Sequence, residues 1–119
     1  AALEAAAFQT RDLLEAMAAD GASRAATLRV DGGMVASDWA MQFLADMTGI
    51  VVERPVVTET TSLGAAYLAG LATGLYTSTD ALALHWRRER RFVPQMGADE
   101  RAERYAGWRD AVARTLVKP

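Results

Sequence analysis

The sequence contains no cysteine and only one histidine, and these shortages limit its chemistry. Without cysteine, the chain can form neither a disulfide bond nor a thiolate metal site. With one histidine, a zinc site would depend on carboxylates, so we expect the chain alone to bind no metal. The sequence also lacks an apolar run of the roughly 18 residues that span a bilayer. We therefore expect a soluble, cytoplasmic protein with no membrane contact.

Proline is scarce as well, at 3 of 119 residues, while 51% of the residues are hydrophobic. This composition is typical of a globular protein rather than a disordered one. The length suits one compact core, and no long hydrophilic linker interrupts it, so we expect one folding unit. The net charge of −2 is unevenly distributed, because the charged residues before His85 are mostly acidic, whereas basic residues gather at 87–91.

Hydrophobic spacing predicts helices that alternate with strands in the first half of the chain. Residues 3–17 repeat apolar or small side chains at helical spacing, and residues 26–30 alternate as in a strand. The strand runs directly into residues 31–33, Asp-Gly-Gly, and residues 40–47 predict an amphipathic helix. Residues 50–52 are a β-branched run that fits a second strand. The β-α-β order favours parallel pairing and hence an α/β fold.

The second half predicts three more elements and one irregular segment. Residues 63–73 are almost wholly small or apolar and predict a buried helix, whose small residues would let a neighbouring backbone approach. Its N-cap candidates are Thr58, Thr60, Thr61 and Ser62, and Gly74 can end it. A short helical turn follows at 78–84, then an edge strand or extended segment at 86–93. Asp99 can cap a last helix that runs to Leu116.

The glycine pair Gly32-Gly33 is the feature that points most clearly to chemistry. A glycine pair between a strand and a helix brings backbone N–H groups close to whatever lies above the turn. Phosphate is favoured there by the unpaired N–H groups and by the positive end of the helix dipole. Asp31 would repel phosphate unless it coordinates magnesium or faces away. From spacing alone, the pair could also be a tight βα connection and nothing more.

Four segments together resemble the glycerol kinases of the FGGY family of carbohydrate kinases. The resemblance follows the family's order and spacing and covers essentially the whole chain. The segments are LEAAAFQTRDLLEAM (3–17), LRVDGGMVASDWAMQF (28–43), VERPVVTETTSLGAAYLAGLATG (52–74) and RRFVPQMGADERAERYAGW (90–108). The glycine turn and the LGAA helix are shared with other FGGY kinases, whereas VERP and RYAGW point to the glycerol branch.

The resemblance implies an actin-like, ribonuclease-H-like ATPase fold in which two domains close over ATP and a polyol. Residues 1–119 would be the C-terminal part of the second, nucleotide-binding domain. By similarity, Gly33 contacts the adenine nucleotide and Gly32 shapes the same turn. Ser37 stands where the family usually has an asparagine that helps to hold the nucleotide. A serine hydroxyl can still make one hydrogen bond, but its shorter reach leaves room for an intervening water.

The resemblance also implies an activity that this chain cannot perform alone. Glycerol kinases transfer the γ-phosphoryl group of ATP to glycerol with Mg²⁺ as a cofactor. The polyol-binding residues, the catalytic base and the phosphate-gripping residues belong to other parts of such an enzyme, so none is assigned here. The expected partners are ATP or ADP, glycerol, the remaining kinase chain and further copies in a homo-oligomer, without nucleic acid. A fragment that positions one reactant forfeits most of the advantage of a closed site, and we expect it to be inactive.

Two other functions stay open. The chain could belong to another FGGY kinase, for xylulose, gluconate or ribulose, or it could be a noncatalytic module that uses buried helices as an oligomer surface. Missing core partners of a fragment would leave apolar surface exposed.

Several single residues have both a structural and a functional interpretation. His85 has no acidic or nucleophilic partner at a suggestive spacing, which favours a structural or surface role. The basic stretch 87–91 could bind nucleic acid, but Glu89 interrupts it, which favours a solvated edge or a domain contact. In some glycerol kinases the position of Glu100 helps to hold zinc in a regulatory complex; here a role at a helix N-terminus is favoured. Core packing, rather than base stacking, best explains the aromatic residues Trp86, Phe92, Tyr105 and Trp108.

Overall fold

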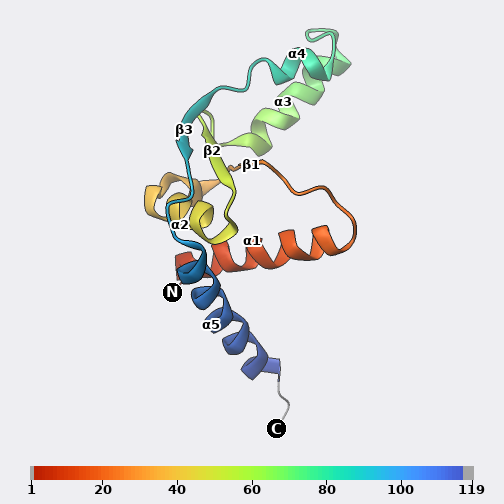
Figure 1. Ribbon diagram of the computed structural model, residues 1–119. Coiled ribbons are helices and arrows are strands. Elements are labelled where there is room, and N and C mark those ends of the chain that lie inside the picture. Colours follow the sequence, from red (N-terminus) through yellow and green to blue (C-terminus); the bar gives the residue numbers. More distant parts are fainter. Residues whose placement is uncertain (1, 117–119) are drawn as a thin grey trace.

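The computed structural model describes residues 2–116 and has the mixed α/β order that the sequence predicts. Helices and strands follow one another from the red end to the blue end in Figure 1. The short element η1 is a 3-10 helix. In chain order the elements are α1 (Ala2–Ala19), β1 (Thr27–Arg29), η1 (Gly33–Ala36), α2 (Asp38–Thr48), β2 (Val51–Pro55), α3 (Thr60–Ala72), α4 (Thr79–Ala83), β3 (Arg88–Phe92) and α5 (Ala98–Leu116).

The three strands form one sheet in the order β1-β2-β3. β1 pairs with β2 in parallel, with Thr27 opposite Val51, which confirms the pairing predicted from the β-α-β order. β2 pairs with β3 in antiparallel fashion, with Val52 opposite Phe92, and an irregularity lies between Arg54 and Pro55. β3 therefore lies at an edge, where its charged side chains can reach water.

The hydrophobic core is built around α2. This helix contacts α1, β2, β3 and α5, and most of its residues are buried. Met47 on α2 and Val52 on β2 are the largest fully buried side chains. Burying an aliphatic side chain of this kind contributes about 1.5–3 kcal/mol to stability. The whole cluster consists of Ala7, Val35, Ala40, Met41, Phe43, Leu44, Ala45, Met47, Val52, Phe92 and Tyr105.

Helix α5 is tied to α1 through the carboxylate of Asp12. The Tyr105 hydroxyl donates to one oxygen of Asp12 at 2.5 Å, and Trp108 Nε1 donates to the other at 2.7 Å. Burial, followed by the hydrogen bond to Asp12, raises the pKa of the Tyr105 hydroxyl, so this group stays protonated and able to donate. The rings of Phe8 and Trp108 are stacked at 5.3 Å. Tyr105 and Trp108 thus serve core packing, as the helical spacing predicted.

The start of α5 differs from the prediction. The helix begins at Ala98, and the Arg101 N–H donates to the carbonyl of Gly97, so Asp99 lies within the first turn instead of capping it. The negative charges of Asp99 and Glu100 still stabilise this end of the helix through its dipole. Glu100 is also paired with Arg104, one helical turn later, at 2.8 Å.

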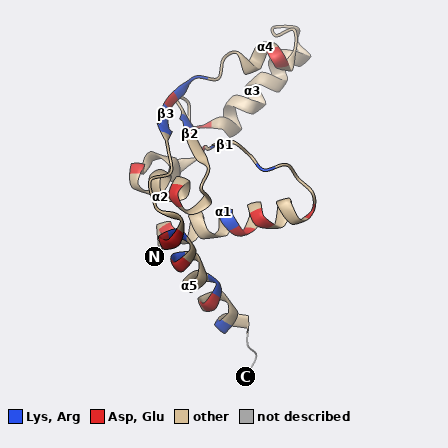
Figure 2. Ribbon diagram, viewed as in Figure 1, with Lys and Arg blue, Asp and Glu red and all other residues tan. Residues whose placement is uncertain are grey.

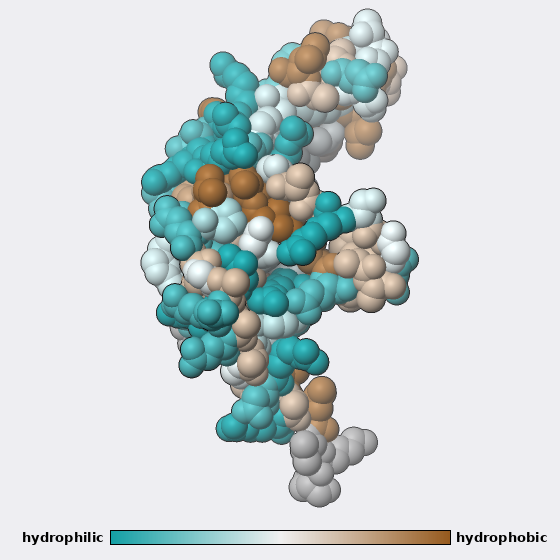
Figure 3. All heavy atoms as spheres, in the orientation of Figure 1, coloured by the Kyte–Doolittle hydropathy of each residue, from teal (hydrophilic) through white to brown (hydrophobic). Residues whose placement is uncertain are grey.

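The prediction that residues 63–73 form a buried helix is wrong for the described chain. Helix α3 projects away from the sheet together with α4 (Figure 1), and Gly70 is its one buried residue within the described chain. Leu68 is 69% exposed, and Leu75 just beyond the helix is 74% exposed. Hydrophobic side chains accordingly gather on this helical arm, the segment 60–84 (Figure 3). A hydrophobic pattern shows that a helix needs a partner, but not that the same segment of chain supplies it.

The two interior glycines of α3 are used differently from the prediction. The backbone that comes near Gly70 is that of the turn just after the helix, where the Leu75 and Tyr76 N–H groups donate to the Gly70 carbonyl at 2.8 and 3.2 Å. A Cβ added at Gly64 would meet nothing within 4 Å, whereas a Cβ at Gly70 would lie 2.5 Å from the ring of Tyr76. Gly70 thus makes room for an aromatic side chain. The predicted N-caps are also not used, because Glu59 occupies the cap position and makes no side-chain capping bond.

The arm makes the chain more extended than one compact folding unit would be. The radius of gyration of the chain is 17.4 Å, whereas a compact chain of this length has about 13.5 Å. Within residues 2–116, no helix combines the length and apolar character that a membrane span requires.

The link between α1 and α5 can be tested with Asp12→Ala. Removing this carboxylate leaves Trp108 Nε1 without an acceptor and Tyr105 with only Glu15, so we expect α5 to lose about 1–3 kcal/mol of stability. The measurement is hydrogen exchange of α5 amides in the whole protein. Asp110→Ala is the control, since its exposed pair with Arg114 contributes about 0.5 kcal/mol. Equal effects of the two variants would contradict the inferred role of Asp12.

Candidate functional site

The glycine turn lies at the carboxyl end of β1, and Gly32 is the residue whose backbone shapes it. Its φ of 87° belongs to the region that side chains other than glycine's rarely adopt. Its N–H donates to the carbonyl of Thr58 at 3.0 Å, which joins the turn to the segment between β2 and α3. The turn's own geometry therefore accounts for glycine at position 32.

Gly33 has no such explanation within the chain. Its backbone is not in the left-handed region, and a Cβ added there would meet nothing within 4 Å. Gly33 is also exposed, and its N–H has no hydrogen-bond acceptor among residues 2–116. The space beside Gly33 is thus open, and a free backbone donor adjoins it. Both properties suit a bound anion.

The glycine pair does not lie at the N-terminus of α2, where the sequence placed it. Residues 33–36 form η1 instead, with the Val35 N–H donating to the Gly32 carbonyl at 3.2 Å. Helix α2 begins only at Asp38. The dipole expected behind the turn is therefore that of a single 3-10 turn, which is much weaker than that of an α-helix.

Ser37 connects η1 to α2 and acts as the N-cap of α2. Its Oγ accepts a hydrogen bond from the Ala40 N–H at 3.3 Å, which satisfies one of the unpaired donors at the start of the helix. This bond uses a lone pair of the hydroxyl and leaves its proton free to be donated elsewhere. Capping and contact with a ligand are therefore compatible at this position.

Asp31 faces α3. Its carboxylate accepts a hydrogen bond from the hydroxyl of Thr60, the first residue of α3. A carboxylate engaged in this way repels an anion beside Gly33 less than one turned toward it would. Within the described residues, no group of three carboxylate or imidazole side chains is placed to hold a metal ion.

Arg54 stabilises the segment that follows the glycine turn, a role that the sequence analysis did not predict. Its guanidinium donates to the Val35 carbonyl at 2.7 Å and pairs with Asp38 at 2.9 Å and Glu89 at 2.7 Å. The side chain is only 11% exposed. The hydrogen bond to Glu89, chiefly, raises the pKa of Arg54 further above its usual value, so the group is always charged. The sequence feature that could have indicated this role is a basic residue, Arg54, inside the otherwise buried strand of the VERP segment.

The basic stretch on β3 is largely paired with acids. Arg90 pairs with Asp38, and Arg88 pairs with Glu53 at 2.7 Å. Figure 2 shows the mixed charges of β3 beside those of the neighbouring elements. This pairing supports the interpretation of 87–91 as a solvated edge, since paired guanidinium groups are less available to phosphates.

His85 directly follows the helical arm. It is exposed, its Nδ1 lies 3.1 Å from the carbonyl of Ala81, and its ring contacts the rings of Tyr67 and Tyr76. Trp86 lies under the guanidinium of Arg29, which is 4.1 Å from the ring centroid. These contacts are structural in kind, as expected for His85.

Comparison with known proteins finds relatives along nearly the whole chain. The family described as the FGGY family of carbohydrate kinases, C-terminal domain, matches residues 1–73. A glycerol kinase of Alcanivorax borkumensis is 61% identical over 114 residues, which are 96% of this chain and 23% of that protein. A glycerol kinase of Ectopseudomonas mendocina is 60% identical over the same shares of both chains. The chain therefore spans about a quarter of the length of the curated relatives that it matches.

Solved structures give the same result for the fold. The crystal structure of Plasmodium falciparum glycerol kinase with ADP is similar at a TM-score of 0.80 and 35% identity, over 98% of this chain and 24% of that one. A xylulose kinase from Lactobacillus acidophilus is similar at a TM-score of 0.71 and 20% identity, over 93% of this chain and 23% of that one. These likenesses confirm the α/β fold, that of the C-terminal domain of an actin-like, ribonuclease-H-like ATPase.

The support of the turn by Arg54 can be tested with Arg54→Met. The variant keeps most of the buried stem but loses the hydrogen bond to Val35 and both ion pairs. We therefore expect the free energy of unfolding to fall by about 2 kcal/mol. The measurement is the urea unfolding of the whole protein, together with hydrogen exchange at Val35 and Ser37. In the control Arg90→Met, a half-exposed pair with Asp38 is lost, at about 0.5 kcal/mol. Unchanged exchange at Val35 and Ser37 in Arg54→Met would disprove the supporting role.

Proposed function

Because the chain belongs to the FGGY family of carbohydrate kinases, we propose that residues 1–119 are the C-terminal part of the second, nucleotide-binding domain of a glycerol kinase. The single observation that carries this assignment is the identity of 61% with a protein named glycerol kinase, over 96% of the chain. An identity at this level over 114 residues favours the glycerol branch over the rest of the family.

The proposed reaction transfers the γ-phosphoryl group of ATP to a terminal hydroxyl of glycerol, which gives ADP and glycerol 3-phosphate. Such transfers depend on positioning and on electrostatic stabilisation of the phosphoryl group. This chain would contribute to positioning. The Gly33 N–H and the open space beside it suit a phosphate of the nucleotide, and Ser37 can donate its hydroxyl proton to the same ligand. Arg54 keeps both residues in place through Val35 and Asp38.

The residues at the glycine turn suit ATP better than they suit Mg²⁺. An open turn with a free N–H is what a phosphate requires, since a side chain at position 33 would occupy the approach. Mg²⁺ in kinases is held by one or two carboxylates together with the substrate phosphates. The carboxylate nearest to the turn in sequence is Asp31, which is engaged by Thr60. The ligands of Mg²⁺ would therefore come from the nucleotide and from the remaining kinase chain.

The remaining kinase chain would also supply the polyol site and the catalytic base, so residues 1–119 alone would be inactive. The proposal further includes a cytoplasmic enzyme that forms a homo-oligomer and binds neither nucleic acid nor membrane. An apolar arm is consistent with contacts to another part of the kinase or to a second copy. A noncatalytic interaction module would use the same arm but would not need the open turn at Gly33. Another FGGY kinase would differ in its polyol.

The substrate and the turn can be tested together with the variant pair Gly33→Asp and Gly33→Asn in the whole protein. The two side chains have the same size, but only aspartate adds a negative charge beside the proposed phosphate. We expect Gly33→Asp to raise KM for ATP at least about tenfold more than Gly33→Asn does. Both variants should unfold like wild type, because nothing lies within 4 Å of the added Cβ.

The assay is ADP formation with ATP and Mg²⁺, comparing glycerol with xylulose, ribulose and gluconate. Turnover with glycerol that is lost in Gly33→Asp supports both parts of the proposal. Turnover only with another sugar would overturn the glycerol assignment, and equal KM values for Asp and Asn would overturn the placement of phosphate beside Gly33.

Ser37 can be tested by restoring the family's usual asparagine. Ser37→Asn keeps the N-cap, because asparagine caps helices as well as serine does, and its longer reach should lower KM for ATP. Ser37→Ala separates the two roles: it loses the cap, at about 1 kcal/mol, and also the hydroxyl donor. A KM for ATP that is unchanged in both variants would show that position 37 does not contact the nucleotide.

A further inference from the structure

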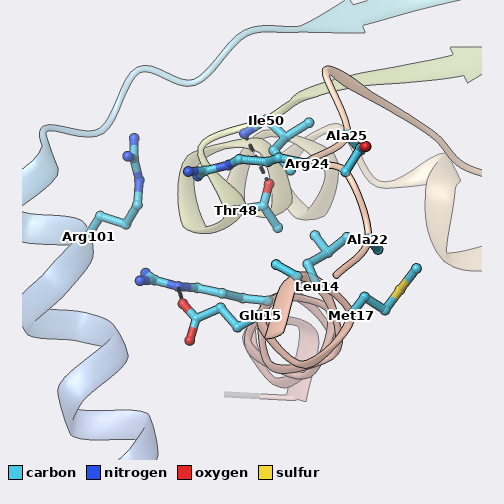
Figure 4. A pocket seen from close by; sticks show the side chains of 12 residues that line it. Leu14, Glu15, Met17, Ala22, Arg24, Ala25, Thr48, Ile50 and Arg101 are labelled. Atoms are coloured by element: carbon cyan, nitrogen blue, oxygen red, sulfur yellow. Dashed lines mark hydrogen bonds and ion pairs between the residues drawn. The ribbon is translucent and has the colours of Figure 1, made fainter. Parts of the chain in front are cut away.

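A concave site lies at the other end of the parallel strands from the glycine turn. It has a volume of about 340 Å³ and is bounded by α1, the loop between α1 and β1, the end of α2 and α5. β1 and β2 both begin beside it, at Thr27 and Val51, whereas the glycine turn follows the carboxyl end of β1. Three guanidinium groups line it, those of Arg11, Arg24 and Arg101. Figure 4 labels Arg24 and Arg101.

Arg101 is held in place by backbone groups without being neutralised. Its Nε donates to the Asp46 carbonyl and its Nη2 to the Met96 carbonyl at 2.9 Å. Gly49 makes room for it, since a Cβ at that position would lie 3.1 Å from Arg101 Nη1. Among residues 2–116, Arg101 forms no ion pair with a carboxylate. Its full positive charge is therefore fixed, half-buried, at the pocket.

Arg24 adds a second charge without a counterion. It comes from the loop between α1 and β1, and in Figure 4 its guanidinium extends toward that of Arg101 across the pocket. Within the described chain it has neither an ion pair nor a side-chain hydrogen bond. Two unpaired cations that line one pocket repel each other, and a bound anion would relieve this repulsion.

Arg11 supplies the third charge and Glu15 the one carboxylate that lines the pocket. Arg11 pairs with Glu15 at 2.8 Å, and its guanidinium lies 3.8 Å from the ring centroid of Tyr105, which fixes its orientation. The lining thus carries three positive charges and one negative charge, a net charge of two positive units. A divalent anion would balance it.

We propose that Arg11, Arg24 and Arg101 bind a small, soluble phosphate monoester in its dianionic form. Guanidinium groups match phosphate oxygens with paired N–H donors, and a phosphate monoester carries about −1.5 to −2 charges at neutral pH. Leu14 and Met17 line the remaining wall and suit a short organic part. The volume falls within the range of small-molecule sites, roughly 300–1,000 Å³.

The proposal can be tested by titrating the whole protein with inorganic phosphate and with methyl phosphate, a monoester that is not the product of the proposed reaction, by calorimetry without nucleotide or polyol. We expect Arg24→Ala to weaken binding at least about tenfold, as the loss of a charge-assisted bidentate contact implies. Arg24 is exposed and forms no ion pair or side-chain hydrogen bond within the described chain, so this variant should keep the fold. Arg109→Ala, an exposed arginine on α5 outside the pocket, is the matched control and should bind like wild type.

Gly33→Asp separates this site from the proposed nucleotide site, and phosphate binding that depends on Arg24 should survive it. Absence of binding in wild type, or binding equally strong in Arg24→Ala, would overturn the proposal. Sedimentation with vesicles that contain phosphatidic acid distinguishes the two sources of a phosphate monoester. Cosedimentation that requires Arg24, without binding of the soluble compounds, would overturn the soluble ligand in favour of a lipid headgroup. These outcomes do not depend on whether the protein phosphorylates glycerol.

Discussion

The burial of α2 is the constraint on which the rest of the structure depends. Ala45 and Met47 are fully buried between α1 and the sheet, and the helix contributes more residues to the core than any other described element. Both candidate sites lie at its ends. The helix begins after Ser37 and the glycine turn. It ends at Thr48 and Gly49, beside the arginine pocket. A helix fixed along its length in this way holds the two ends at a constant separation.

The parts of the fold that depend on local patterning could be predicted from the sequence. Helical spacing found α1, α2 and α5, and alternation found β1, because each of these elements has at least one side chain that packs against the core of the chain itself. The exposure of α3 could not be predicted. Its apolar composition expresses a need for burial, and nothing in that composition specifies which surface satisfies it.

The candidate site was predictable to a similar extent. Gly32-Gly33 stands out because two adjacent glycines after a strand have few explanations, and the structure accounts for Gly32 by its positive φ. The contributions of Arg54 and Thr60 were not predictable, since both reach the turn from segments more than 15 residues away in sequence. The insertion of η1 was missed for another reason. Four residues give no periodicity by which a 3-10 helix can be distinguished from the first turn of an α-helix.

The bonds of Gly32 to Thr58 and of Asp31 to Thr60 make the base of the helical arm a fulcrum. Helix α3 has 13 residues, so at 1.5 Å per residue its far end lies roughly 20 Å from that base. The glycine turn is attached within a few ångströms of the pivot. By the ratio of these two lengths, a swing of the arm reaches the turn as a several-fold smaller displacement. A swing of the arm would therefore disturb the geometry around Gly33 little.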